Sequence, residues 1–129
     1  MPKILIVDDD PLVRMSLADV LLESGYEVSA AIDGDNGLEE FARASFDLVV
    51  LDILMPRREG LETMREIRKK WSSLPVLAIS GGDRTGWCDY LRMASDFGAS
   101  DTMAKPFSSK ELVDRVARLI GRAKSQTLA

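Results

Sequence analysis

Three short runs of apolar residues, none alternating with polar ones, constrain the fold of this chain more than any other feature. They span residues 4–7, 48–51 and 76–79, and each is four residues long. Strands buried on both faces of a parallel sheet show this pattern, because neither face presents polar side chains to water. Two more mixed segments, residues 27–31 and 101–104, suit strands at the edges of the same sheet. The runs therefore predict a parallel sheet with an apolar centre.

Helical periodicity lies between the predicted strands. Apolar residues at helical spacing form three stripes: Leu61, Met64, Ile67 and Trp71; Trp87, Tyr90, Leu91 and Ala94; and Leu112, Val113, Val116, Leu119 and Ile120. Asp10 followed by Pro11 is typical of a helix start, and Gly25 and Gly98 stand where helices are expected to end. Alternating strands and helices predict an α/β fold, a doubly wound five-stranded parallel sheet with helices on both faces.

Length and charge narrow the class of protein. The 129 residues suffice for one domain, and residues 122–129 suit a frayed tail or a truncated linker. A net charge of -4 argues against direct nucleic-acid binding, because the molecule repels phosphate backbones. The first apolar run is too short for a signal-peptide core or a membrane span. A single cysteine, Cys88, excludes an internal disulfide, so we expect a cytoplasmic protein without membrane association.

Polar side chains follow the apolar runs where the strands are expected to end. They are Asp8, Asp9 and Asp10 after the first strand, Asp52 after the third, Ser80 after the fourth and Lys105 after the fifth. Ligands of open α/β sheets bind outside the carboxyl ends of the strands, so these groups should meet at one edge. Clustered carboxylates repel one another unless a cation is bound. Because the chain contains no histidine, the ligand set is oxygen alone and suits Mg2+.

A lysine beside such a metal can hold a phosphoryl oxygen as a point charge. A carboxylate can attack phosphorus, and positioning with charge neutralisation supplies most of the catalysis. The residues at the predicted edge therefore indicate metal-dependent phosphoryl transfer onto an aspartate.

In their order along the chain, these motifs resemble the receiver domains of response regulators in two-component signalling. The resemblance rests on Asp8-Asp9, on Asp52-Ile53-Leu54-Met55-Pro56 with Gly60, on Ser80-Gly81 and on Lys105-Pro106-Phe107. It implies a receiver domain over residues 1–121, with a flavodoxin-like sheet in the order 2-1-3-4-5 and five helices. It also implies a cis peptide bond between Lys105 and Pro106.

The resemblance implies a role for each site residue. Asp52 would accept the phosphoryl group from a sensor histidine kinase, a phosphotransfer protein or a small phosphodonor. Ser80 matches the switch hydroxyl of the family, and Lys105 the lysine that pairs with the phosphoryl group. The metal set, for Mg2+, would be Asp8 (largely through water), Asp9 (directly), Asp52 and the backbone carbonyl of Leu54.

A receiver of this kind is not a conventional enzyme, although it catalyses its own phosphorylation and dephosphorylation. It would signal through altered binding of a downstream protein target, or of an output domain in a longer regulator. Phosphorylation-dependent dimerisation stays open.

The sequence departs from the family pattern at Thr102. Receivers often carry Tyr or Phe at this position, three residues before the lysine, as the second half of a hydroxyl-aromatic switch. A threonine cannot act as a ring that moves between buried and exposed states. Our hypothesis is that the signal leaves through the neighbouring fourth helix, with Trp87 and Tyr90 near its start.

Three other functions compete with this interpretation. In a haloacid-dehalogenase-like phosphohydrolase Asp8 would carry the phosphoryl group, but that family needs an acidic pair after Lys105, where only Glu111 and Asp114 follow, inside a predicted helix. Such an enzyme would also leave Asp52 unexplained. A flavodoxin-like cofactor binder would need a hydroxyl- and glycine-rich loop after the first strand, where this chain has acids. A pure interaction module would not need the intact acid set.

Overall fold

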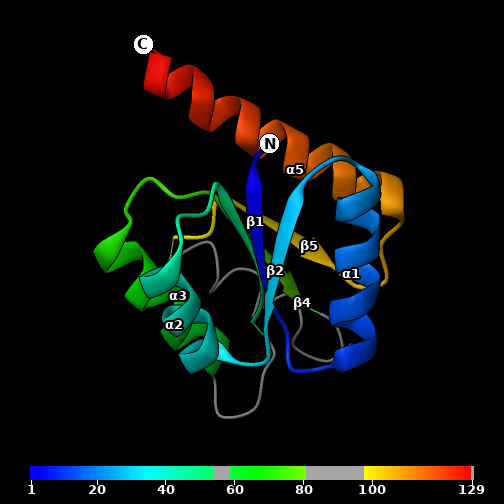
Figure 1. Cartoon of the computed structure of the whole chain (residues 1–129), viewed down its shortest axis with the longest axis horizontal. Helices are drawn as coiled ribbons and strands as arrows, with labels where there is room; N and C mark the ends of the chain where they lie inside the picture. The colour runs from blue at the N-terminus through cyan, green and yellow to red at the C-terminus, as the bar shows by residue number, and fades with distance from the viewer. Residues whose placement is uncertain (54–58, 81–97, 129) are drawn as a thin grey trace.

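The structure of the chain is a computed structural model that describes residues 1–53, 59–80 and 98–128. The described part contains five strands and four helices (Figure 1). In chain order these are β1 (Lys3–Val7), α1 (Pro11–Glu23), β2 (Glu27–Ala31), α2 (Gly34–Arg43), β3 (Leu48–Asp52), α3 (Glu59–Lys70), β4 (Val76–Ser80), β5 (Asp101–Ala104) and α5 (Ser109–Leu128). Every predicted strand is present, with bounds that shift by at most one residue.

All strands of the sheet are parallel, in the order β2-β1-β3-β4-β5. Helices α1 and α5 cover one face and α2 and α3 the other. Figure 1 shows α1 to the right of the sheet and α2 and α3 to its left. The α/β class and the strand order are therefore confirmed. The stripe at residues 87–94, expected to form a helix between β4 and β5, lies outside the described residues.

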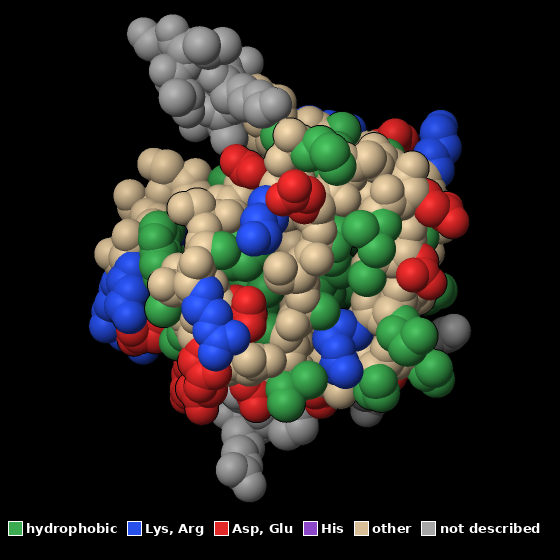
Figure 2. All heavy atoms as spheres, in the orientation of Figure 1, with side chains coloured by type: hydrophobic (Ala, Val, Ile, Leu, Met, Phe, Trp, Pro, Cys, Tyr) green, Lys and Arg blue, Asp and Glu red, His purple; other side chains and the backbone are tan. Residues whose placement is uncertain are grey.

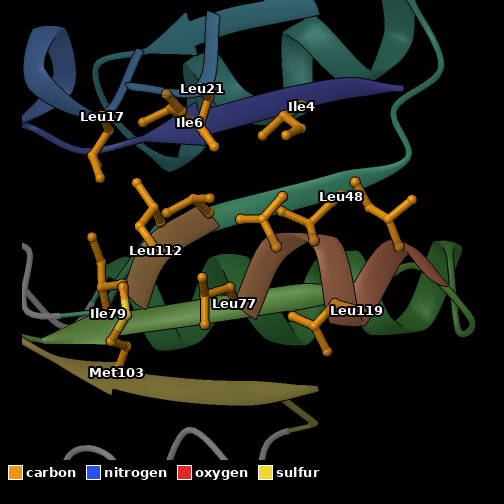
Figure 3. Close-up of a cluster of buried hydrophobic side chains, with 13 residues drawn as sticks. Ile4, Ile6, Leu17, Leu21, Leu48, Leu77, Ile79, Met103, Leu112 and Leu119 are labelled. Carbon is orange, nitrogen blue, oxygen red and sulfur yellow. The ribbon is translucent and has the colours of Figure 1, made fainter. Parts of the chain in front are cut away.

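Two hydrophobic layers explain why the central strands lack polar alternation. Successive residues of β1, β3 and β4 point to opposite faces, and both faces are buried. One layer joins Leu5, Val7, Val49, Leu51 and Ala78 of the sheet to α2 and α3. The other joins Ile4, Ile6, Leu48, Val50, Leu77 and Ile79 to α1 and α5. Figure 3 shows Leu48, Leu77 and Ile79 of the strands around Leu112 and Leu119 of α5.

Helix α1 begins and ends at the residues that the sequence predicted. Asp10 caps this helix by accepting a hydrogen bond from the Leu12 N–H, at 2.9 Å, and Pro11 is the first helical residue. Gly25, just after α1, has a φ of 95°, a conformation that favours glycine. At the other end of the chain, α5 continues to Leu128, so residues 122–128 are helical (Figure 1). None of the described helices has the length and hydropathy needed to cross a membrane.

Candidate functional site

Three carboxylates gather where β1 and β3 end. These strands are neighbours, and their register pairs Val7 with Leu51, so the residues that follow, Asp8 and Asp52, come side by side. One carboxylate oxygen each from Asp8, Asp9 and Asp52 lies within 4.8 Å of the others. Asp8 is fully buried and Asp52 is 5% exposed, whereas Asp9 is exposed. The structure thus brings Asp52 beside two adjacent acids, Asp8 and Asp9, that precede it by more than forty residues.

Lys105 enters the same pocket from the loop after β5. Its Nζ lies 3.3 Å from Asp8 Oδ2 and 3.7 Å from Asp52 Oδ2. The backbone places it there, because the Lys105 N–H donates to the carbonyl oxygen of Ser80 at 2.8 Å and extends the β4–β5 pairing. The Lys105–Pro106 bond is cis, as the resemblance implied.

Ser80, the last residue of β4, carries an unsatisfied hydroxyl. The residue is 1% exposed, and its Oγ has no hydrogen-bond partner among the described residues. A buried hydroxyl without a partner costs about 1–3 kcal/mol, so folded proteins rarely keep one unless water, a ligand or an ion satisfies it. The hydroxyl therefore indicates that something polar binds at this edge.

Asp8 is held by several hydrogen bonds. Its N–H donates to the Ala31 carbonyl at 3.2 Å, and its Oδ1 accepts the Asp10 N–H at 2.9 Å. Its carbonyl oxygen accepts Arg14 Nη1 at 2.8 Å. Arg14 was not among the residues predicted from the sequence. The available signal was weak: a long cation one helical turn into the helix that follows the acidic loop.

The donor set fits a hard divalent cation. Among the described residues, three carboxylates face one ammonium, which leaves an excess of negative charge in a largely buried pocket. Carboxylate oxygens without histidine or thiolate are the ligands that Mg2+ prefers. The Ser80 hydroxyl supplies a neutral oxygen beside them. The backbone carbonyl of Leu54, expected as a further ligand, lies outside the described residues.

Thr102 lies in β5, paired in register with Ala78 of β4, and is partly buried. Its carbonyl oxygen accepts Arg115 Nη1 of α5 at 2.7 Å, and the same nitrogen lies 3.1 Å from Asp101 Oδ1. Arg115 therefore ties α5 to this edge strand. The proposed exit helix with Trp87 and Tyr90 lies outside the described residues, so the hypothesis on signal output stays a prediction.

A groove of about 380 Å³ borders the pocket between α1 and the loop after β5. It is lined by Leu12, Val13, Ser16, Leu17, Lys105, Pro106 and Phe107. Leu12 of this lining and Met15 of α1 are 76% and 62% exposed, and Figure 2 shows hydrophobic side chains gathered over the start of α1 at the lower right. An apolar surface thus adjoins the charged pocket.

The sequence matches the family model described as the response regulator receiver domain, over residues 4–117. The chain belongs to this family. Receiver domains are parts of two-component systems, which is the class of protein that the acid and lysine motifs predicted. Membership leaves the dehalogenase-like alternative without support.

Individual relatives agree with this family. The receiver is 41% identical to the response regulator MprA of Mycobacterium leprae (strain TN) over 128 residues, which are 98% of this chain and 54% of the relative. A crystal structure of NtrX from Brucella abortus, in complex with ADP, superposes with a TM-score of 0.91 at 32% identity, covering 98% of this chain and 28% of that one. A CheY-like receiver domain protein from Methanospirillum hungatei JF-1 gives a TM-score of 0.88 at 25% identity, with 98% of both chains covered. The receiver thus spans about half the length of the curated relatives it matches.

Proposed function

We infer that this receiver domain takes a phosphoryl group onto Asp52, in a carboxylate pocket that binds Mg2+, and signals through changed partner binding. The observation that carries the proposal is the meeting of Asp52, Asp8 and Lys105 at one nearly buried point of the sheet edge. The unsatisfied Ser80 hydroxyl at the same edge supports it independently. We take residues 1–121 as the phosphorylated unit.

The transfer step follows from the groups present. An Asp52 carboxylate oxygen attacks phosphorus and forms an O–P bond as the N–P bond of a phosphohistidine breaks; the electron pair stays on the imidazole nitrogen, which takes up a proton. The chain has no histidine, so a histidine donor must belong to a kinase or phosphotransfer protein. Lys105 is placed to neutralise a phosphoryl oxygen, and the Ser80 O–H to donate a hydrogen bond to another.

Asp8, Asp9 and Asp52 would hold Mg2+, which when bound supplies positive charge against the phosphoryl oxygens. Asp8, buried and anchored on all sides, would keep the pocket's shape whether or not the metal is bound. The exposed Asp9 leaves one side of the pocket open for exchange of metal and donor.

The groove beside Lys105 suits the approach of the donor. An amphipathic helix carrying the phosphohistidine could place apolar side chains against Leu12 and Phe107 while its imidazole faces Asp52. Output would follow from a partner or output domain that binds the phosphorylated form. The net charge of -4 argues against direct contact with nucleic acid by this domain.

Phosphorylation by acetyl phosphate in the presence of MgCl2 tests the proposal. We expect intact-mass analysis to show one added phosphoryl group, mapped to Asp52 by reductive trapping. D52N should take up none, and chelation of the metal should prevent labelling. The matched control is D19N, which changes an exposed aspartate of α1 and should label normally. A label on Asp8, or D52N taking up phosphate at the wild-type rate and amount, would overturn the proposal.

A further inference from the structure

We propose that Arg14 is a positioning residue of the metal pocket, whose guanidinium fixes the peptide joining Asp8 to Asp9 and thereby presents the Asp9 carboxylate. The observation is the hydrogen bond of 2.8 Å from Arg14 Nη1 to the Asp8 carbonyl oxygen. The inference rests on the proposed function as far as Mg2+ is concerned. Its structural part, the holding of the loop, stands without the metal.

Arg14 donates two hydrogen bonds to the loop formed by residues 8–10. Its backbone N–H donates to the Asp10 carbonyl oxygen at 2.9 Å, as the first turn of α1 requires, while its side chain reaches back to the Asp8 carbonyl. A third hydrogen bond closes the loop from inside, from the Asp10 N–H to Asp8 Oδ1 at 2.9 Å. Residues 8–10 are therefore bound to the helix that follows them, and Arg14 is the only side chain of α1 for which the described structure shows such a bond.

Asp9 depends on this grip more than Asp8 does. The Asp8 carboxylate is fully buried and also contacts Lys105, so its position is fixed several times over. Asp9 is exposed, and no described residue hydrogen bonds to its side chain. The orientation of the Asp9 side chain is therefore set by the peptide groups on either side of it. Arg14 holds the preceding one, through the carbonyl oxygen of Asp8. Loss of the guanidinium should therefore release Asp9 first.

An electrostatic role and a positioning role of Arg14 predict opposite changes in Mg2+ affinity when the side chain is removed. A guanidinium close to the pocket repels a divalent cation, so charge alone predicts tighter Mg2+ binding when it is removed. Loss of positioning predicts weaker binding, because an outer residue that orients ligands typically changes metal affinity about 10-fold or more. The sign of the change therefore separates the two roles.

The experiment measures Mg2+ affinity by calorimetric titration of wild type, R14A, R14K and R43A. Arg43 is an exposed arginine of α2 whose contact is Glu40, so R43A removes the same charge away from the loop. We expect R14A to weaken Mg2+ binding about 10-fold. R14K, which keeps a charged donor of similar reach, should recover most of the affinity, and R43A should leave it within about 2-fold of wild type. R14A binding Mg2+ as tightly as wild type, or more tightly, would overturn the proposal.

A metal-free measurement keeps the two proposals apart. Hydrogen exchange of the Asp10 amide reports on its bond to Asp8 Oδ1. In R14A this amide should exchange several-fold faster than in wild type, roughly the change expected when a local opening becomes easier, and in R43A it should not change. Wild type that fails to bind Mg2+ would sink the proposed function, while unchanged Asp10 exchange in R14A would sink the role of Arg14.

Discussion

Two partly buried cations at opposite ends of the strands face opposite kinds of partner: Lys105 at the carboxyl edge, where the strands end, and Arg68 at the amino edge, where they begin. At the carboxyl edge, Lys105 Nζ lies 3.3 Å from Asp8 and 3.7 Å from Asp52, both carboxylates. At the amino edge, Arg68 of α3 donates to neutral oxygens of the loops that lead into β4 and β5. These are the carbonyls of Leu74 (2.6 Å), Gly98 (2.7 Å), Trp71 (3.2 Å) and Ser72 (3.2 Å), and Ser100 Oγ (3.1 Å).

The difference in partners suggests different roles for the two clusters, one in stability and the other in binding. The carbonyls around Arg68 carry no net charge, so the guanidinium satisfies them by hydrogen bonds without a further ion. Burial lowers the pKa of the Arg68 guanidinium by stripping water from the charged form, although the group stays protonated at neutral pH. Among the described residues, the carboxylates around Lys105 outnumber the ammonium, so under the proposed function a bound cation would balance the charge of that cluster. We therefore expect the Arg68 cluster to contribute to stability and the carboxylate cluster, under the proposed function, to bind a cation.

The largest effect on stability is expected from Arg68→Ala. It removes a charged donor from several carbonyls at once, and we expect a loss of about 3 kcal/mol in the free energy of unfolding, measured by urea denaturation. Arg68→Lys should recover less than half of this loss, because an ammonium cannot reproduce the planar fork. Mg2+ affinity of the folded protein should not change.

The control for Arg68→Ala is Arg43→Ala, whose side chain is 72% exposed and 3.5 Å from Glu40; it should cost less than about 0.5 kcal/mol. If Arg68→Ala cost no more than this control, the amino edge would not owe its stability to the guanidinium.

Gly98→Ala tests the Arg68 cluster by changing the loop residue that packs against the Arg68 side chain. Gly98 has a φ of 107°, and an added Cβ would meet Arg68 Cγ at 2.9 Å. We expect a loss of about 2 kcal/mol, part from backbone strain and part from displacing Arg68. Gly25→Ala isolates the strain, since Gly25 has a φ of 95° and an added Cβ meets nothing within 4 Å; it should cost about 1 kcal/mol.

In an Arg68→Ala background, Gly98→Ala should cost no more than Gly25→Ala, because the colliding side chain is gone. An unchanged cost of Gly98→Ala in that background would show that Arg68 moves aside freely in the wild type.

The sequence predicted the residues that meet at the carboxyl edge, but it did not predict the Arg68 cluster at the amino edge. Apolar runs and helical stripes predicted the strands, because burial on both faces leaves a pattern in composition. The convergence of Asp8, Asp52 and Lys105 followed from a rule of topology, that parallel strands end at one edge. The order of the strands came from the family resemblance rather than from any pattern in the residues.

Arg68 and Arg14 escaped prediction for one physical reason. Both act by reaching backbone carbonyls, and which carbonyls lie within reach depends on the path of a loop, which side-chain periodicity does not encode. Arg68 is followed by Lys69 and Lys70 in the last turn of α3, and nothing in the sequence alone distinguishes the one that turns inward. The proposed metal ligands stood out because acids at the end of a buried strand are unusual, whereas a helix arginine is common.

Asp52→Asn tests whether the carboxyl edge sacrifices stability for binding. Neutralising one of three clustered acids relieves repulsion and leaves Lys105 paired with Asp8, so in EDTA we expect a gain of about 1 kcal/mol in unfolding free energy. Adding MgCl2 should stabilise wild type through binding and should stabilise the variant much less. A variant less stable than wild type in EDTA would show that Asp52 contributes net stability, against the contrast drawn above.

The smallest effect is expected from Asp47→Asn, the same chemical change at the opposite end of the same strand. Asp47 directly precedes β3, and Asp52 is its last residue. Asp47 Oδ2 accepts the Lys3 N–H at 2.7 Å, and the Asp47 N–H donates to the Lys3 carbonyl at 2.7 Å, so the residue joins β1 to β3 at the amino edge. Asparagine keeps the accepting oxygen and loses only the contribution of the charge, so we expect a loss of about 0.5 kcal/mol and an unchanged response to MgCl2. The two variants should therefore change the free energy of unfolding in opposite directions. The Asp47 carboxylate serves as a hydrogen-bond acceptor, whereas the charge of Asp52 is expected to oppose folding until a cation binds. If Asp47→Asn also raised stability in EDTA, the gain in Asp52→Asn would reflect the general acidity of the chain, and the distinction between the two edges would fail.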